Sequence, residues 1–207
     1  MDVPRLHVIT DETVQDRYGH AALARLALAG GADAVQFREK RPWTTGQLVD
    51  VGRAIVTACR EANAVAVIND RADVALTTGA GGLHLGRDDL DVASARRILG
   101  AAVLIGGTAN SYDEAMAVAD TDVDYLGVGP VYGTRSKANP APVMGLETLA
   151  RIARGTPKPV VAIGGVTAMR IPETMQTGVH GVAVLSDVVI ADDPVSSTRA
   201  CRAGLPG

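Results

Sequence analysis

Short apolar runs recur along the chain at intervals of about 25 residues, a spacing typical of a strand, a helix and two loops. They cover residues 6–10, 34–38, 66–69, 82–85, 104–108, 125–129, 160–163 and 181–185. Segments with helical periodicity lie between most of them, and the clearest cover residues 21–29, 45–62, 92–99, 112–119 and 146–153. Apolar runs of this length are typical of buried strands, so the pattern predicts strand–helix alternation.

Residues at the ends of the helical segments support this alternation. Thr44 precedes one segment, and Ser111 precedes Asp113 and Glu114, an N-cap serine with acids in the first turn. After the seventh run, Thr167 opens the next segment. Glycines that can adopt left-handed C-cap geometry follow helical runs at Gly30-Gly31, Gly100 and Gly178.

Strict alternation predicts a parallel sheet, because parallel strands need crossover connections. Such a sheet either closes into a barrel or stays open and doubly wound. A count of eight strands favours the barrel, and the glycine fingerprint of dinucleotide-binding sheets is missing after the first run, where Thr10, Asp11 and Glu12 stand. We therefore expect an α/β chain with a single (β/α)8 TIM barrel over residues 1–207.

Composition narrows the class of partner. Apolar residues make up 47% of the chain and aromatic residues 3%, and the formal net charge is -3. With few aromatic rings and no basic stripe, nucleic-acid binding has little support. Cys59 and Cys201 lie outside any metal-binding spacing, so we expect reduced thiols in a soluble, cytoplasmic protein. We expect no signal peptide and no membrane span, and the sequence leaves homo-oligomerisation open.

Charged residues cluster after the second run, which continues through Gln36, Phe37, Arg38, Glu39 and Lys40. In TIM-barrel enzymes the active site lies at the carboxyl ends of the strands. Alternation places Gln36, Arg38 and Lys40 on one side of the chain, and Phe37 and Glu39 on the other. A guanidinium and an ammonium together suit a di- or triphosphate.

A purely structural alternative exists for this cluster. Arg38 and Lys40 could simply pair with Glu39 and Asp33 at a strand end, because surface ion pairs are common and weak. A Schiff-base role for Lys40, or for Lys137 further along the chain, is the second class of chemistry that the sequence leaves open.

Carboxylates follow the third and fourth runs. Asp70 comes directly after Asn69, and Asp88 and Asp89 follow the next run. Two carboxylates that converge beside phosphate-binding cations are typical of a Mg2+ site. Spacing alone does not separate Asp88 from Asp89, and the alternative is that these aspartates cap the helices that follow.

Two further segments suit anions. The loop after the sixth run contains Gly133 and, next to it, two hydroxyls and two cations, in the order Thr134, Arg135, Ser136 and Lys137. Gly164-Gly165 and Ser186 follow the seventh and eighth runs, where many barrels bind phosphate. Two anion sites imply two phosphorylated ligands or one ligand with two ends. The structural alternatives are a solvated loop and a tight glycine turn.

Six segments resemble motifs of the thiamine phosphate synthase family, in the same order. They cover residues 36–40, 67–70, 83–89, 129–134, 162–165 and 181–186, so the resemblance extends over nearly the whole chain. It implies a transferase that joins hydroxymethylpyrimidine diphosphate to a thiazole phosphate, giving thiamine phosphate and diphosphate.

The resemblance also implies roles for residues. Asp70 and Asp89 would bind Mg2+, which favours Asp89 over Asp88, while Arg38, Lys40 and Lys137 would neutralise the departing diphosphate. The full set of implied substrate-binding residues is Gln36, Phe37, Arg38, Glu39, Lys40, Asn69, Thr108, Thr134, Arg135, Ser136, Lys137, Gly165, Leu185 and Ser186. In this set Thr134 and Ser136 would contact the thiazole, and Gly165 with Leu185 and Ser186 would hold its phosphate. Arg135 has no assigned role.

Two other functions compete with the synthase. The related thiazole tautomerase needs no metal, but its catalytic His would fall near Asn110, and it tends to lose the pair kept here as Asn69-Asp70. The other is a non-catalytic barrel that binds a phosphorylated ligand, since fold does not determine function. Simple binding would not need both Asp70 and Asp89, so the synthase is favoured.

Overall fold

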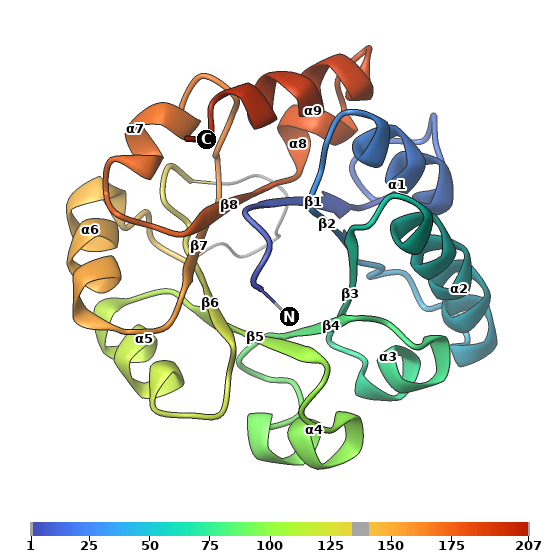
Figure 1. The fold of residues 1–207 in the computed structure, drawn as a ribbon, viewed down its shortest axis with the longest axis horizontal. Helices are drawn as coiled ribbons and strands as arrows, with labels where there is room; N and C mark the ends of the chain where they lie inside the picture. The colour runs from blue at the N-terminus through green and yellow to red at the C-terminus, as the bar shows by residue number, and fades with distance from the viewer. Residues whose placement is uncertain (1, 134–140, 207) are drawn as a thin grey trace.

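Eight parallel strands form a closed barrel in the computed structural model, which describes residues 2–133 and 141–206 (Figure 1). Each strand pairs with the next one in sequence, and β8 closes the barrel by pairing with β1. The strands are β1 (Leu6–Thr10), β2 (Ala34–Phe37), β3 (Val65–Asn69), β4 (Gly82–Leu85), β5 (Leu104–Ala109), β6 (Tyr125–Val128), β7 (Val160–Ile163) and β8 (Gly181–Val184). The predicted TIM barrel is confirmed, and the open sheet is excluded.

Helices form an outer ring around the strands (Figure 1). They are α1 (His20–Ala29), α2 (Thr45–Glu61), α3 (Ala72–Thr78), α4 (Val92–Leu99), α5 (Tyr112–Ala119), α6 (Gly145–Gly155), α7 (Ile171–Met175), α8 (Ser186–Val189) and α9 (Pro194–Ala203). The five clearest predicted helices are present as α1, α2, α4, α5 and α6. Thr44 and Ser111 cap α2 and α5 as predicted.

The segment after β7 differs from the prediction. Thr167 does not begin a helix, because α7 starts one turn later, at Ile171. The carbonyl of Thr167 instead accepts hydrogen bonds from the N–H groups of Arg170 and Ile171, at 2.9 and 3.0 Å. Residues 164–170, between β7 and α7, are therefore a non-helical loop at the carboxyl end of β7.

Alternate residues of each strand point to two different surroundings. Outward residues such as Val35 and Phe37 belong to the large core between the sheet and the helices. Inward residues, among them Ile9, Tyr125 and Val161, form a second apolar cluster inside the barrel. This alternation, which follows from the pleat of the strands, lets polar residues near the strand ends face the barrel mouth.

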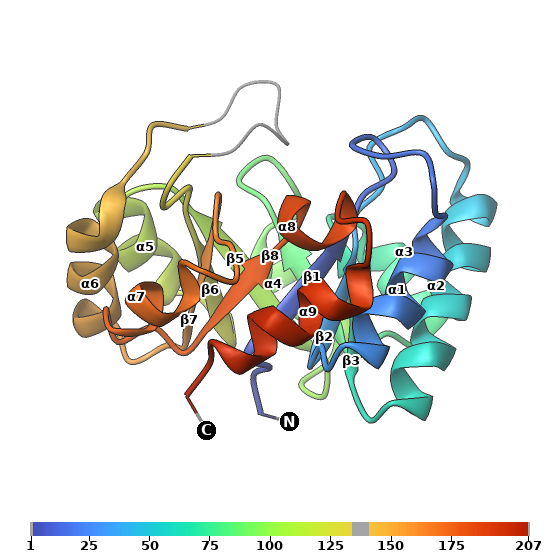
Figure 2. The same cartoon turned by 90° about the horizontal axis from the view of Figure 1, so that it is seen from above.

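The two chain termini lie at the same end of the barrel, below the strands in the view of Figure 2. The helices α1–α9 of the described ranges include none that is both long and apolar enough to cross a membrane. Cys59 and Cys201 are buried and unpaired, in agreement with the expected reduced thiols.

Candidate active site

A cavity of about 490 Å³ opens at the carboxyl ends of the strands, and every strand contributes to its lining. Ten of the predicted site residues line it together, namely Gln36, Arg38, Lys40, Asn69, Asp70, Asp89, Thr108, Gly165, Leu185 and Ser186. Four others, Thr134, Arg135, Ser136 and Lys137, lie outside the described residues. Most of the predicted site residues in the described ranges therefore share one cavity at this end of the barrel.

Two cations reach the cavity from the end of β2. The backbone N–H of Arg38 donates to the carbonyl of Thr10 at 3.2 Å, which continues the pairing of β2 with β1 beyond the strand. The Arg38 guanidinium forms an ion pair with Asp11, and the Lys40 ammonium forms one with Asp70. Both cations are thus held against carboxylates that come from neighbouring strand ends.

The alternative partners predicted for these cations are wrong. Glu39 does not pair with Arg38 or Lys40, because its carboxylate is bound by Arg41. Asp33 pairs with Arg202, on α9. The cations therefore do not pair with these two acidic residues, and both of them line the cavity.

The side chains of Phe37 and Glu39 lie on the opposite side of the chain from the cavity. Phe37 is buried among residues that face the helices, with its ring 4.7 Å from that of His20. The Glu39 side chain is 1% exposed and contacts the same histidine. A contact of these two residues with a ligand would therefore have to come from their backbone atoms, and their predicted role in binding stays a prediction.

Two carboxylates meet at the mouth between β3 and β4. Asp70 has a left-handed backbone conformation, with φ 67°, and Asp89 accepts a hydrogen bond from the N–H of Gly86 at 2.7 Å. Burial, and then the neighbouring Asp70, raise the pKa of Asp89 above its usual value. Besides burial, the contribution of Asp70 to this shift indicates that the two carboxyl groups lie close together.

Neither carboxylate caps a helix. The N-cap of α3 is Arg71, whose side chain makes no capping hydrogen bond, and the N-cap of α4 is Asp91, which accepts from Ser94 N at 2.8 Å. The capping alternative for Asp70 and Asp89 is therefore wrong. Two carboxylates left free of helix ends and set side by side are a donor set that fits Mg2+, since this ion prefers carboxylate oxygens and retains several waters.

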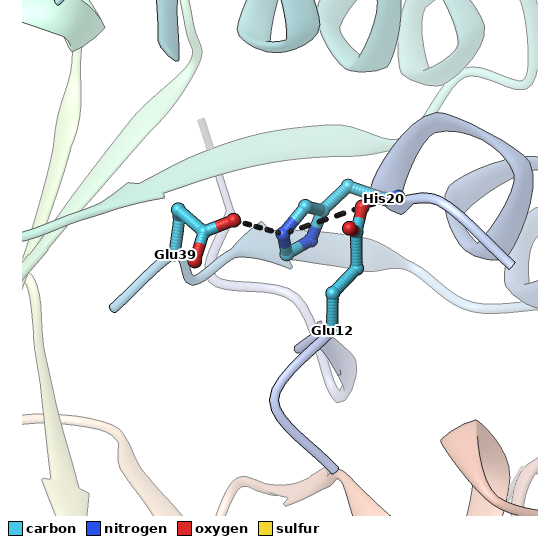
Figure 3. Close-up of side chains that lie close together, drawn as sticks. All are labelled: Glu12, His20 and Glu39. Carbon is cyan, nitrogen blue, oxygen red and sulfur yellow. Dashed lines mark hydrogen bonds and ion pairs between the residues drawn. The ribbon is translucent and has the colours of Figure 1, made fainter. Parts of the chain in front are cut away.

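A second group with metal-ligand chemistry lies outside the cavity. Glu12, His20 and Glu39 place ligand atoms within 4.8 Å of one another (Figure 3). Arg41 already supplies a cation there, because its guanidinium donates to both Glu12 and Glu39. Burial alone would raise the pKa of Glu39, but hydrogen bonds from Arg41 and His20 lower it to about 2. These four residues therefore form a brace behind the end of β2 rather than a metal site.

A hydrogen-bonded row crosses the inside of the barrel below the mouth. His84 contacts the hydroxyl of Thr108 at 2.9 Å through Nε2 and the hydroxyl of Tyr125 at 3.2 Å through Nδ1. The His84 ring has room only because β6 carries a glycine beside it. A Cβ on Gly127 would lie 2.6 Å from the ring. His84 is thus both a bonded interior residue and part of the cavity wall.

The other side of the cavity is built from backbone. Gly164 and Gly165 have φ of 93° and 71°, a conformation that glycine adopts without strain. The turn packs closely, since a Cβ on Gly164 would lie 2.5 Å from Pro130. Asp187, in the first turn of α8, holds the next part of the β7–α7 loop by accepting from the N–H of Ala168 at 2.8 Å. Gly164 and Gly165 thus form a closely packed bend that also lines the cavity, and the predicted binding of a phosphate there stays a prediction.

Two residues that contact predicted site residues are missing from the sequence prediction. Asp11 contacts the predicted cation Arg38, and His20 belongs to the brace around Glu39. A signal for Asp11 was present, because it follows the first apolar run just as the predicted residues follow later runs. His20 carries no such signal, since it opens a helix and reaches the brace only through the fold.

Fold and cavity together define a TIM barrel with a polar site at the carboxyl ends of its strands, the location of active sites in enzymes of this class. A family model described as thiamine monophosphate synthase matches residues 6–188. The chain belongs to this family.

Individual relatives agree over nearly the whole length. A thiamine-phosphate synthase of Salinibacter ruber is 43% identical over 205 residues, 99% of this chain and 90% of the relative. A thiamine-phosphate synthase of Chloroflexus aurantiacus is 39% identical over 96% of this chain and 91% of the relative. The structure of a thiamine phosphate pyrophosphorylase from Pyrococcus furiosus superposes with a TM-score of 0.88 at 36% identity, covering 97% of this chain and 94% of that one.

Proposed function

We propose that the chain is a Mg2+-dependent transferase that couples hydroxymethylpyrimidine diphosphate to a thiazole phosphate. The bond between the pyrimidine methylene carbon and the diphosphate oxygen breaks, and a bond between that carbon and the thiazole nitrogen forms. The products are thiamine phosphate and diphosphate, so the bonding electrons of the C–O bond leave with the diphosphate. This is the reaction implied by the family to which the chain belongs.

The observation that supports the proposal is that two groups of residues suited to binding anions line a single cavity. Arg38, Lys40 and Asp70 line it from the ends of β2 and β3, and Gly165 and Ser186 line it from the ends of β7 and β8. In the closed barrel, β1 separates the two groups on one side and β4 to β6 separate them on the other. A diphosphate on one side and a monophosphate on the other would bring the two rings together between them.

The residues of the chain would mainly position the substrates and stabilise departing charge. Arg38 and Lys40 would face the diphosphate, and Lys40 would exchange part of its contact with Asp70 for a phosphate oxygen. Mg2+ held by Asp70 and Asp89 would supply further neutralisation of the leaving group. The Thr108 hydroxyl, fixed by His84, would lie beside the pyrimidine.

Removal of one carboxylate tests the proposal. We expect Asp70→Ala to abolish Mg2+-dependent diphosphate release from the two substrates, while circular dichroism shows an unchanged fold. Asp73→Ala is the matched control, because Asp73 lies three residues away, exposed and paired with Arg71 outside the cavity. Wild-type protein that releases no diphosphate would overturn the proposal, and tautomerase activity should then be assayed.

A further inference from the structure

Asp11 is a fully buried carboxylate directly behind the cavity. It follows β1, its side chain is 0% exposed, and it is not among the described residues that line the cavity. One carboxylate oxygen accepts hydrogen bonds from the Thr13 N–H at 2.8 Å and from the Thr13 hydroxyl at 2.6 Å. The other oxygen accepts from Nη1 of Arg38. Both oxygens are therefore fixed, one by its own loop and one by the cation of the neighbouring strand.

The guanidinium of Arg38 is only partly used by this contact. Its side chain is 12% exposed and lines the cavity, and within residues 2–133 and 141–206 its hydrogen bond to Asp11 is its sole side-chain hydrogen bond. A guanidinium carries five N–H donors in a rigid plane, so one anchored nitrogen sets the direction of the others. A buried charge such as Asp11 requires a partner, which makes the anchor costly to break.

We infer that Asp11 is a positioning residue that orients the Arg38 guanidinium so that its remaining N–H groups face the bound diphosphate. The identity of that ligand rests on the proposed function. Asp11 itself would not touch the substrate. It would act through Arg38, in the same way that carboxylates behind metal-ligating or catalytic histidines fix the ring that does the chemistry.

The direction in which diphosphate affinity changes on substitution of Asp11 distinguishes a positioning role from a simple electrostatic effect. A carboxylate next to an anion site repels the anion, so loss of the Asp11 charge alone would strengthen diphosphate binding. Loss of a guanidinium's orientation would weaken it, because a charge-assisted hydrogen bond to phosphate depends on geometry. The two explanations therefore predict opposite changes for the same substitution.

The test is calorimetric titration of Asp11→Asn with hydroxymethylpyrimidine diphosphate in the presence of Mg2+ and without the thiazole. We expect affinity to fall about tenfold, the loss of roughly one charge-assisted hydrogen bond. Asp33→Asn is the matched control, because Asp33 also pairs with an arginine, Arg202, and also accepts from a backbone N–H, that of Leu6, yet lies outside the cavity lining. We expect the Asp33 variant to bind as the wild type does.

A double-mutant cycle shows whether the effect passes through Arg38. In an Arg38→Met background, we expect Asp11→Asn to cause no further loss of diphosphate affinity, because the group that it positions is gone. Should Asp11→Asn fail to fold, Thr13→Val provides a milder variant at an exposed position, since it removes one hydrogen bond that fixes the carboxylate and keeps its charge. It should weaken diphosphate binding by only about two- to threefold, because the Thr13 N–H still holds the same carboxylate oxygen.

The outcomes distinguish this inference from the proposed function. Wild-type protein that does not bind the pyrimidine diphosphate overturns the proposed function. Wild-type binding together with unchanged or tighter binding by the Asp11 variant overturns the positioning role alone. Equal losses from Asp11→Asn with and without Arg38 would also overturn it, because the carboxylate would then act by another route.

Discussion

At the scale of single residues, the candidate site holds two carboxyl groups close together in the wall of the cavity. Asp70 lies close enough to Asp89 to raise its pKa, and Lys40 pairs with Asp70. Burial and the second carboxylate raise the pKa of Asp89, which means that its ionised form is disfavoured in the folded protein. Such an arrangement costs stability and is typical of sites that are completed by a ligand.

Because the ionised form of Asp89 is disfavoured in the folded state, we expect Asp89→Asn to stabilise the metal-free protein. A carboxyl group with a raised pKa binds protons more tightly when folded than when unfolded, so its contribution to stability falls as pH rises through that pKa. At neutral pH the amide removes this penalty and can still accept from Gly86, and we expect the Tm to rise by a few degrees. The Tm increase caused by Mg2+ in the wild type should disappear, as scanning calorimetry would show.

The neighbouring aspartate is the control for this prediction. Asp88 is exposed and also lines the cavity, but the carboxylate that raises the pKa of Asp89 belongs to Asp70 rather than to Asp88. Asp88→Asn should therefore keep the wild-type response to Mg2+. If the Asp88 variant loses this response and the Asp89 variant keeps it, Asp88 rather than Asp89 is the Mg2+ ligand.

At the scale of elements, the loops after the strands set the two sides of the cavity in different ways. The end of β2 presents charged side chains, whereas the turn after β7 presents backbone in a conformation that only glycine adopts easily. A Cβ on Gly165 would lie 2.4 Å from the carbonyl oxygen of Gly133 and 2.9 Å from the Cβ of Tyr132, so the turn would have to shift to accept it. The turn is therefore sensitive to a single methyl group.

Gly165→Ala should act on one substrate only. We expect it to weaken thiazole phosphate binding at least tenfold and to destabilise the protein by about 1–3 kcal/mol, from backbone strain and overpacking. Affinity for the pyrimidine diphosphate should stay as in the wild type. Gly178→Ala is the control, since Gly178 has φ 89° but open space around a Cβ, so it tests strain without contact. Titration of each substrate separately gives the comparison.

The elements were largely predictable from the sequence because each signal is local. The apolar runs and the helical periodicity depend on near neighbours, and the capping by Thr44 and Ser111 depends on residues three positions away. The alternation along β2 likewise placed Arg38 and Lys40 toward the cavity. Local patterns of this kind predict the fold well because every strand of the barrel is a short buried apolar run. All strands end at the same mouth.

The partners of the site residues were not predictable in the same way. Arg38 pairs with Asp11, 27 positions away, and Lys40 pairs with Asp70, 30 positions away, while the sequence suggested Glu39 and Asp33. Such pairs depend on the register between strands, which neither spacing nor composition encodes. The brace of Glu12, His20, Glu39 and Arg41 was missed for the same reason.

At the scale of the whole molecule, the closed barrel buries polar rings that an open sheet would leave at a surface. His7 is 1% exposed on the inner side of β1, with its ring 5.4 Å from that of Tyr125 and its Nε2 3.0 Å from the carbonyl of Pro4. Burial lowers its pKa to about 4, and burial also lowers the pKa of His20. Closure of the barrel therefore ties global stability to pH.

The sign of this dependence follows from the direction in which each pKa moves. A histidine whose pKa is lower in the folded state binds protons more tightly when unfolded, so its contribution to stability is complete above the ordinary pKa of 6.5 and is lost as pH falls toward about 4. Between pH 7 and pH 4.5, His7 alone should remove about 2–3 kcal/mol of the free energy of unfolding. Glu39, with a pKa of about 2, loses its contribution only below this window.

Urea unfolding of the wild type and of His7→Gln at several pH values measures this contribution directly. The variant should be less stable at pH 7, because it loses packing inside the barrel, but its decline between pH 7 and pH 4.5 should be smaller by most of the roughly 2–3 kcal/mol that His7 contributes. His20 remains in the variant, so a residual decline is expected. If the variant loses stability with pH as steeply as the wild type, the acid sensitivity has its origin outside the barrel interior, and closure of the barrel around His7 does not set it.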